Sequence, residues 1–253
     1  IELYAFYGCH SLTSIEIPSG APSIGENAFM HCSSLTNISF GENSQLTSIG
    51  SFAFWYCSSL TSIEIPSGVT SIGYNAFEGC SSLTNISFGE DSQLTSIGSS
   101  AFRDCSSLTG IEIPSGVTSI GDAAFWGCSS LTSVSFGDNS QLASIGDDAF
   151  YGCSNLTSVS FGENSQLNYI GDGAFSWTCI TSIDIPSSVT YLGVAAFAHA
   201  LGGPSPDDFV HSESNVYLSV ITFGENSQLA FIGDGAFYSC SALKSIEIPS
   251  GVT

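Results

Sequence analysis

Basic residues are almost absent from this sequence. Its 253 residues include 2 lysines and arginines against 23 aspartates and glutamates, which gives a formal net charge of -21. A charge of that sign repels the phosphates of nucleic acids and the anionic surfaces of membranes, so the sequence argues against both as partners. It could attract a basic protein patch or divalent cations, although solubility alone accounts for such a charge equally well.

Long apolar stretches are also lacking. No run approaches the roughly 20 apolar residues that a transmembrane helix requires. The chain does not open with the charged and then apolar segments of a signal peptide. We therefore expect no membrane insertion by these residues.

The residue patterns of familiar enzymes are missing as well. The chain has no Ser-His-Asp or Cys-His arrangement, no Gly-rich phosphate loop and no paired-histidine metal motif. His10 and His31 stand next to cysteines, but without the spacing of a zinc site. We predict no enzyme and no bound cofactor; acidic pairs such as Asp147 and Asp148 could hold calcium only weakly.

A repeated unit fills almost the whole chain. Its copies begin at Leu12, Leu35, Leu60, Leu83, Leu108, Leu131, Leu156, Ile180, Leu218 and Leu243. Short units carry the centre IEIPSGVTSIG and long units carry ISFGENSQLTSIG, and the two types alternate at first. A period in the twenties predicts one elongated solenoid domain over residues 1–253, in which each unit buries its apolar side against its neighbours. Because the chain starts and stops within a unit and shows no cap, we expect a fragment.

Each unit predicts the same succession of elements. The apolar alternation over 60–65 is typical of a short strand with one face inward, and a Pro-Ser-Gly or Gly-Glu-Asn-Ser turn follows it. A second extended piece covers 69–72. Phe77 and Cys80 then have the spacing of a single helical turn. Stacked units should therefore form a parallel sheet of about ten short strands along one side.

Two apolar residues recur at fixed positions and should form internal rows. The first row is Phe6, Phe29, Phe54, Phe77, Phe102, Phe125, Phe150, Phe175, Phe197 and Phe237. The second row is Cys9, Cys32, Cys57, Cys80, Cys105, Cys128, Cys153, Cys240 and, shifted by one residue, Cys179. We favour free buried thiols over disulfides, because parallel stacked side chains rarely offer the geometry of a bridge.

These units resemble the BspA-like leucine-rich repeats of bacterial and protist surface proteins, which read Leu-x-x-Ile-x-Ile-Pro and then Val-x-x-Ile-Gly-x-x-Ala-Phe-x-x-Cys. The resemblance covers almost the whole chain. It implies a leucine-rich-repeat solenoid, from α/β to mostly β, that forms a right-handed arc with the parallel sheet on its inner face. It also implies an extracellular or cell-surface location and binding of host or matrix proteins.

One row of strand positions should face outward. It consists of Glu16, Ser39, Glu64, Ser87, Glu112, Ser135, Ser160, Asp184, Thr222 and Glu247. Carboxylates two rungs apart should be separated by roughly 10 Å, and a regular row offers no distinctive pocket, which argues against a glycosidase pair. We predict that Glu16, Glu64, Glu112, Asp184 and Glu247 contact a partner; the alternative is a solvated face with nothing bound.

An insertion at 201–217 interrupts the repeat. Residues added to a solenoid lie on its rim and often contact partners, so Asp207, Asp208, Phe209 and His211 form a second predicted contact patch. The alternative is a tolerated, partly disordered insertion.

These observations favour a non-catalytic, monomeric module of a surface or secreted protein, which binds a protein through its concave strand face and rim insertion. A passive spacer that projects another domain is the alternative. A hydrolase would need carboxylates closer together than the row predicts.

Overall fold

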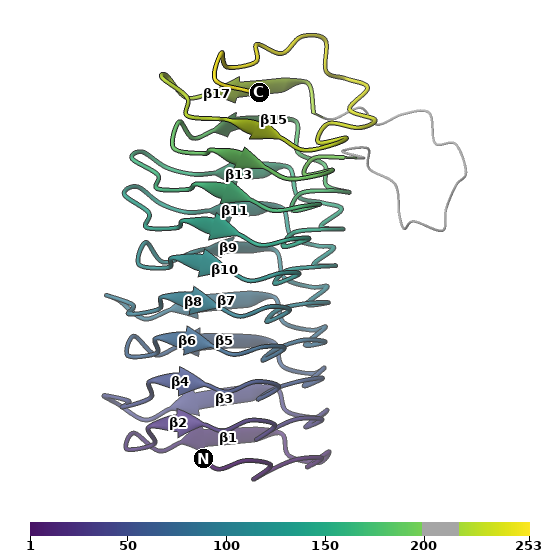
Figure 1. Cartoon of the computed structure of the whole chain (residues 1–253). Coiled ribbons are helices and arrows are strands. Elements are labelled where there is room, and N and C mark those ends of the chain that lie inside the picture. Colours follow the sequence, from purple (N-terminus) through teal and green to yellow (C-terminus); the bar gives the residue numbers. More distant parts are fainter. Residues whose placement is uncertain (199–217) are drawn as a thin grey trace, which may run out of the picture.

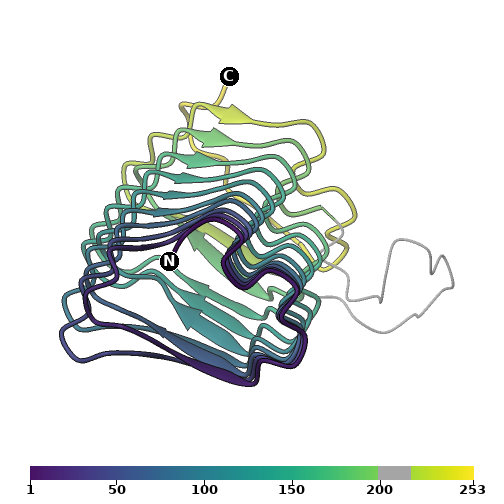
Figure 2. The same ribbon diagram turned by 90° about the horizontal axis from the view of Figure 1, so that it is seen from below.

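The computed structural model describes residues 1–198 and 218–253. Over these residues the chain winds into a stack of rungs that runs from the N-terminus to the C-terminus (Figure 1). Seen along the stack, successive rungs follow one another with a gradual twist (Figure 2). The predicted solenoid of parallel strands is confirmed. The insertion residues Asp207, Asp208, Phe209 and His211 lie outside the described residues.

The first side of each rung is the predicted strand of three or four residues. These strands are β1 (Ser14–Ile17), β3 (Asn37–Phe40), β5 (Ser62–Ile65), β7 (Asn85–Phe88), β9 (Gly110–Glu112), β11 (Ser133–Ser135), β13 (Ser158–Ser160), β15 (Ser182–Ile185) and β17 (Val220–Phe223). Burial alternates along them, as in the pattern exposed, buried, exposed, buried of β5. Their isoleucines face the core, and their polar residues face solvent.

The second side is a strand of only two residues. These strands are β2 (Ser23–Ile24), β4 (Ser48–Ile49), β6 (Ser71–Ile72), β8 (Ser96–Ile97), β10 (Ser119–Ile120), β12 (Ser144–Ile145), β14 (Tyr169–Ile170), β16 (Tyr191–Leu192) and β18 (Phe231–Ile232). All nine pair in parallel as one unbroken sheet. The first side, where the sequence predicted a single sheet, is instead divided into four: β1-β3, β5-β7, β9-β11-β13 and β15-β17.

The third side differs from the helical turn predicted for residues 75–80. No helix occurs within 1–198 and 218–253. Asn75 and Gly79 adopt positive φ angles of 55° and 72°, which flatten the turn. The N–H of Phe77 donates to the carbonyl of Ala101 on the next rung at 2.7 Å, while the N–H of Glu78 donates to Asn75 at 3.2 Å. Alternate N–H groups therefore donate to the next rung and within the turn, so that the third side links neighbouring rungs by backbone hydrogen bonds although it is not a strand.

Identical side chains stack inside the three sides, as the sequence predicted. The phenylalanine rings from Phe6 to Phe237 lie 4.9 to 5.9 Å apart between centroids, with interplanar angles of no more than 16°. Most of these rings are completely buried. Burial of each such side chain stabilises the fold by about 2 to 3 kcal/mol.

The cysteines are free thiols, and the six from Cys32 to Cys153 are buried in the second internal row as predicted, whereas Cys9 is exposed and Cys179 and Cys240 are partly buried. Seven of these thiols donate to the carbonyl of the phenylalanine one rung back, for example Cys80 Sγ to Phe54 O at 3.3 Å. Burial raises the pKa of Cys80 to about 12, so the thiol remains protonated at neutral pH. The predicted place of Cys179 is wrong: Thr178 is fully buried, three residues after Phe175, and Cys179 donates outside the row to Ser154 O at 2.8 Å.

A row of glycines follows the second side and sets how closely the rungs approach. A Cβ atom added to Gly98 would lie 2.8 Å from the carbonyl carbon of Gly73 and 2.9 Å from the oxygen of Ile72. Backbone atoms cannot yield as a flexible side chain can. Glycine is therefore required here by close packing of backbone on backbone.

Replacing Gly98 with alanine should push two rungs apart and lower the free energy of unfolding by about 1 to 3 kcal/mol or more. Gly20→Ala is the matched control, because its Cβ would meet no atom within 4 Å. We expect Gly20→Ala to stay within about 0.5 kcal/mol of the parent chain in urea unfolding. Equal losses in the two variants would contradict the packing argument.

Candidate functional site

The predicted carboxylates lie where the sequence placed them, on the outside of the first side. Glu16, Glu64, Glu112 and Asp184 project from β1, β5, β9 and β15, and Glu247 is exposed in the tenth unit. Each of the four on strands is in register with a hydroxyl on the following rung: Glu16 with Ser39, Glu64 with Ser87, Glu112 with Ser135 and Asp184 with Thr222. The alternation of carboxylate and hydroxyl is thus a real feature of the surface.

These carboxylates differ in how they are engaged. Thr222 Oγ1 donates to Asp184 Oδ1 at 2.7 Å. Within the part of the chain that the structure describes, the Glu64 and Glu112 carboxylates have neither a hydrogen-bond donor nor an ion-pair partner. Both side chains are exposed at the strand face.

Four open clefts, which the sequence did not predict, divide the first side. One of about 820 Å³ lies between β7 and β9, and one of about 420 Å³ lies between β3 and β5. A third of about 520 Å³ separates β13 from β15. A fourth of about 970 Å³ lies between β17 and residues 245–250. Every cleft falls where a long unit is followed by a short one.

Proline explains why the sheet opens at these junctions. Where a short unit precedes a long one, the N–H of Gly41 donates to the carbonyl of Ile17 at 3.0 Å and helps close the ladder. Pro66 takes the place of Gly41 in the next short unit and has no N–H to donate. The N–H of Thr61 still reaches the carbonyl of Thr36, but at 3.4 Å, near the limit for a hydrogen bond. The strands therefore separate beyond that point.

The four clefts are built from equivalent residues. From the short unit, each receives a carboxylate and a proline: Glu64 and Pro66, Glu112 and Pro114, Asp184 and Pro186, or Glu247 and Pro249. From the long unit, each receives a hydroxyl and a phenylalanine: Ser39 and Phe40, Ser87 and Phe88, Ser160 and Phe161, or Thr222 and Phe223. The clefts thus repeat one chemical environment along the stack.

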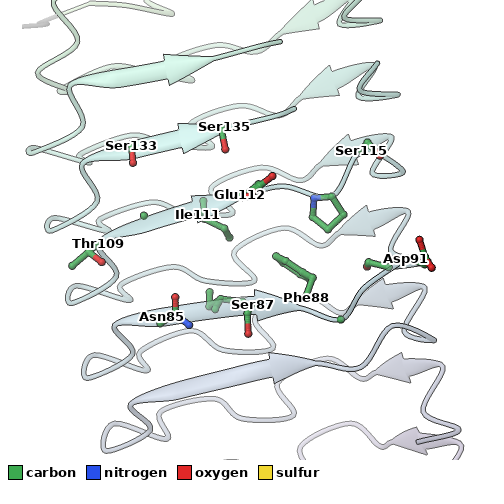
Figure 3. A pocket seen from close by; sticks show the side chains of 15 residues that line it. Asn85, Ser87, Phe88, Asp91, Thr109, Ile111, Glu112, Ser115, Ser133 and Ser135 are labelled. Atoms are coloured by element: carbon green, nitrogen blue, oxygen red, sulfur yellow. The ribbon is translucent and has the colours of Figure 1, made fainter. Parts of the chain in front are cut away.

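Figure 3 shows the arrangement in the cleft between β7 and β9. Phe88 projects from the lower strand and Glu112 from the upper one, so an aromatic ring and a carboxylate lie on opposite sides of the opening. Ser87 lines the same wall as Phe88. The cleft therefore offers an apolar surface, hydroxyls and a negative charge together.

Neither of the two basic residues lines a cleft. Arg103 lies on the third side, where its guanidinium carbon is 4.2 Å from the ring centroid of Trp126 and its Nε is 3.6 Å from Asp104 Oδ2. Lys244 is exposed in the tenth unit and does not line the fourth cleft. The charge of the carboxylates is therefore not neutralised from within the described chain.

A second acidic region runs along the edge between the second and third sides. Asp122, Asp147 and Asp172 each accept, through Oδ1, the N–H of the residue one rung ahead at 2.7 to 3.0 Å. No group of three or more histidine, cysteine or acidic side chains in residues 1–198 and 218–253 is placed to hold a metal ion. These aspartates cap backbone groups and so contribute to the stacking itself.

The parallel strands, the stacked phenylalanines and the glycine row define the class of protein: a leucine-rich-repeat solenoid. The comparison with family models identifies the particular family. Six copies of the BspA type leucine rich repeat region match residues 1–93, 90–201 and 212–253. The chain belongs to this family. None of the described residues forms a helix long and apolar enough to cross a membrane.

Bacterial leucine-rich repeat proteins are among the solved structures to which the chain is similar. A leucine-rich repeat protein from Eubacterium ventriosum superposes with a TM-score of 0.50 at 19% identity, covering 98% of this chain and 76% of that one, and it shows the shared fold. A leucine-rich repeat protein from Bacteroides ovatus is 24% identical, with a TM-score of 0.46 and coverage of 99% and 83%. A leucine rich cell surface protein from Faecalibacterium prausnitzii is 25% identical, with a TM-score of 0.43 and coverage of 92% and 78%. No curated protein sequence matches the chain.

Asp148 provides a test of the acidic edge. Partial desolvation, followed by the neighbouring Asp147, Asp172 and Asp122 carboxylates, raises its pKa. Because the folded-state pKa lies above the unfolded value, the folded chain loses stability as pH rises through it. Asp148→Asn should therefore raise the melting temperature at neutral pH, and the gain should vanish as pH falls to about the unfolded value.

The control for this substitution is Asp91→Asn, because Asp91 has a positive φ of 55° like the 54° of Asp148. Asparagine tolerates this backbone conformation at both positions. Thermal unfolding followed over a pH series should show a larger gain at position 148 than at 91. An equal gain that persists in acid would show that the backbone, and not charge repulsion, is responsible.

Proposed function

We propose that this chain is a non-catalytic protein-binding module, which recognises a partner protein through the first side of its rungs. The observation that carries the proposal is the repeated opening of that side, where carboxylates without partners stand beside strand edges that lack a continuous ladder. Proteins usually blunt or cover such edges, because unpaired backbone groups readily pair with another chain. Here they recur in regular order along an exposed surface.

The other two sides are less suited to recognition. The second side has a complete ladder along all nine strands. On the third side, backbone N–H groups donate to carbonyls of the next rung or of the same turn. The first side combines backbone groups at open strand edges with apolar rings and carboxylates. Solenoids present extended binding surfaces of this kind because each rung repeats the same exposed positions.

The carboxylate arrangement supports a role without catalysis. Glu64 and Glu112 lie two rungs apart, roughly 10 Å at the usual strand spacing, and each is in register with a serine and not with a second carboxylate. A retaining glycosidase needs its two carboxyl groups about 5 to 5.5 Å apart. The residues therefore suit contact with a partner better than acid–base chemistry.

The proposal includes an extracellular or cell-surface location and a monomeric state. Membership of the BspA-type family supports the location. The large negative charge supports the monomer, because copies of the chain repel one another. Host and matrix proteins are then the partner class to be screened.

The test is binding of purified matrix and cell-surface proteins to the immobilised chain, measured by biolayer interferometry. Glu64→Ser combined with Glu112→Ser should weaken a positive interaction about tenfold or more, since two desolvated charge contacts are lost. Glu26→Ser combined with Asp234→Ser removes the same charge beyond the first side and should leave the affinity unchanged. If no protein in the panel binds, the chain is better described as a passive spacer. If both double variants bind a partner alike, the binding surface is not the first side.

A further inference from the structure

The four clefts are not evenly spaced, and their spacing restricts what can occupy them. They lie at the junctions of units two and three, four and five, seven and eight, and nine and ten. Rungs in a parallel stack are about 4.8 Å apart. Measured along the second side, which is paired throughout, the first two clefts, and likewise the last two, are therefore separated by about 10 Å, whereas the middle interval is about 14 Å.

We propose that the first pair of clefts, which contains Glu64 and Glu112, holds one extended, basic segment of the partner protein, which runs along the stack and places an arginine or lysine in each cleft. This inference rests on the proposed function and specifies the partner that the first side recognises. Three observations support this kind of segment: the charge of the clefts, the residues that line them and the distance between them.

The negative charge of the cleft carboxylates favours a positively charged occupant. The clefts with Glu64 and Glu112 contain no basic side chain of the chain itself, and these carboxylates have no donor among the residues described. The rest of the molecule adds further negative charge, for a total of -21. A cation in the cleft gains a charge-assisted hydrogen bond and leaves no buried unpaired charge behind.

The walls of the cleft fit a long basic side chain better than a free ion. The half-buried ring of Phe88 and the ring of Pro114 flank the opening that Glu112 overlooks. An arginine or lysine has an apolar stem that can cover these rings and a charged head that can reach the carboxylate. Ser87 and strand carbonyls outside the ladder supply further acceptors.

The distance between the two clefts determines the spacing of the basic residues in the bound segment. An extended chain or a polyproline II helix advances about 3.1 to 3.4 Å per residue, so three residues span about 10 Å. Basic residues at i and i+3 therefore match two clefts. Spacings of two or four residues give about 6 to 7 Å or 12 to 14 Å and match this interval less well. In polyproline II, residues three apart also lie on the same face.

The experiment uses two fluorescent proline-rich peptides of identical composition. One has arginine at every third position, and its isomer has the arginines two and four positions apart. Binding to the full chain is measured by fluorescence anisotropy at low and at physiological ionic strength. We expect the regular peptide to bind about tenfold more tightly than the isomer, because only the regular peptide fills two clefts at once.

Two sets of variants test the cleft itself. Glu64→Gln with Glu112→Gln should abolish the preference for the regular peptide at the first pair of clefts, while Glu26→Gln with Asp234→Gln should preserve it. Pro66→Ala with Pro114→Ala keeps every charge but restores the missing N–H groups, so that the ladder can close. We expect that variant to lose the preference too. Circular dichroism establishes that each variant is folded.

Three results would overturn the inference. Equal binding of both peptides that weakens in parallel with salt would show attraction by the overall charge alone. A preference that survives the glutamate variants would place the peptide elsewhere. If neither peptide binds while a matrix or cell-surface protein still depends on Glu64 and Glu112, then the partner is not a basic extended segment, although the proposed function stands.

Discussion

The fold depends on one constraint: every rung must approach its neighbour closely enough for backbone hydrogen bonds to form between them. The glycine row makes that approach possible, as a Cβ on Gly98 would collide with the backbone of the preceding rung. Once the spacing is fixed, identical rings stack at about 5 Å and the thiols reach the carbonyls one rung back. The same spacing lets the third side exchange hydrogen bonds through residues with positive φ. Apolar burial stabilises the stack, but the backbone sets its period.

On the first side, neighbouring rungs do not all pair through their backbones. We propose that this side binds the partner. Because the second side is paired throughout, the rungs stay together even though the first side opens at each junction from a long to a short unit. Proline has no N–H donor to lose at these junctions, which lowers the cost of the opening. The repeat places a carboxylate, a hydroxyl and a phenylalanine at each of the four openings in the same order. Recognition can therefore be repeated along the stack without loss of the fold.

Much of the fold could be predicted from the sequence, because a repeat exposes its own core positions. The phenylalanine row, the free thiols, the parallel strands and the outward row of carboxylates are confirmed. The helical turn at residues 75–80 was wrong, because the spacing of Phe77 and Cys80 fits both a helix and a flattened turn, and the left-handed Asn75 decides between them. The clefts were missed because they depend on which unit follows which: Pro66 opens the sheet only because a long unit precedes it. The contact roles of Glu16, Glu64, Glu112, Asp184 and Glu247 stay a proposal.

The central claim is that the order of long and short units decides where the first side is open. Amide hydrogen exchange, resolved by residue in the folded chain, tests it most directly, because exchange reports local backbone protection. β11 is paired on both sides, whereas β5 and β9 each have one neighbour without a ladder. The account predicts slow exchange throughout β11 and a rapidly exchanging set of amides in β5 and β9, with the second-side strands slow everywhere. Uniform protection of all first-side strands would contradict it.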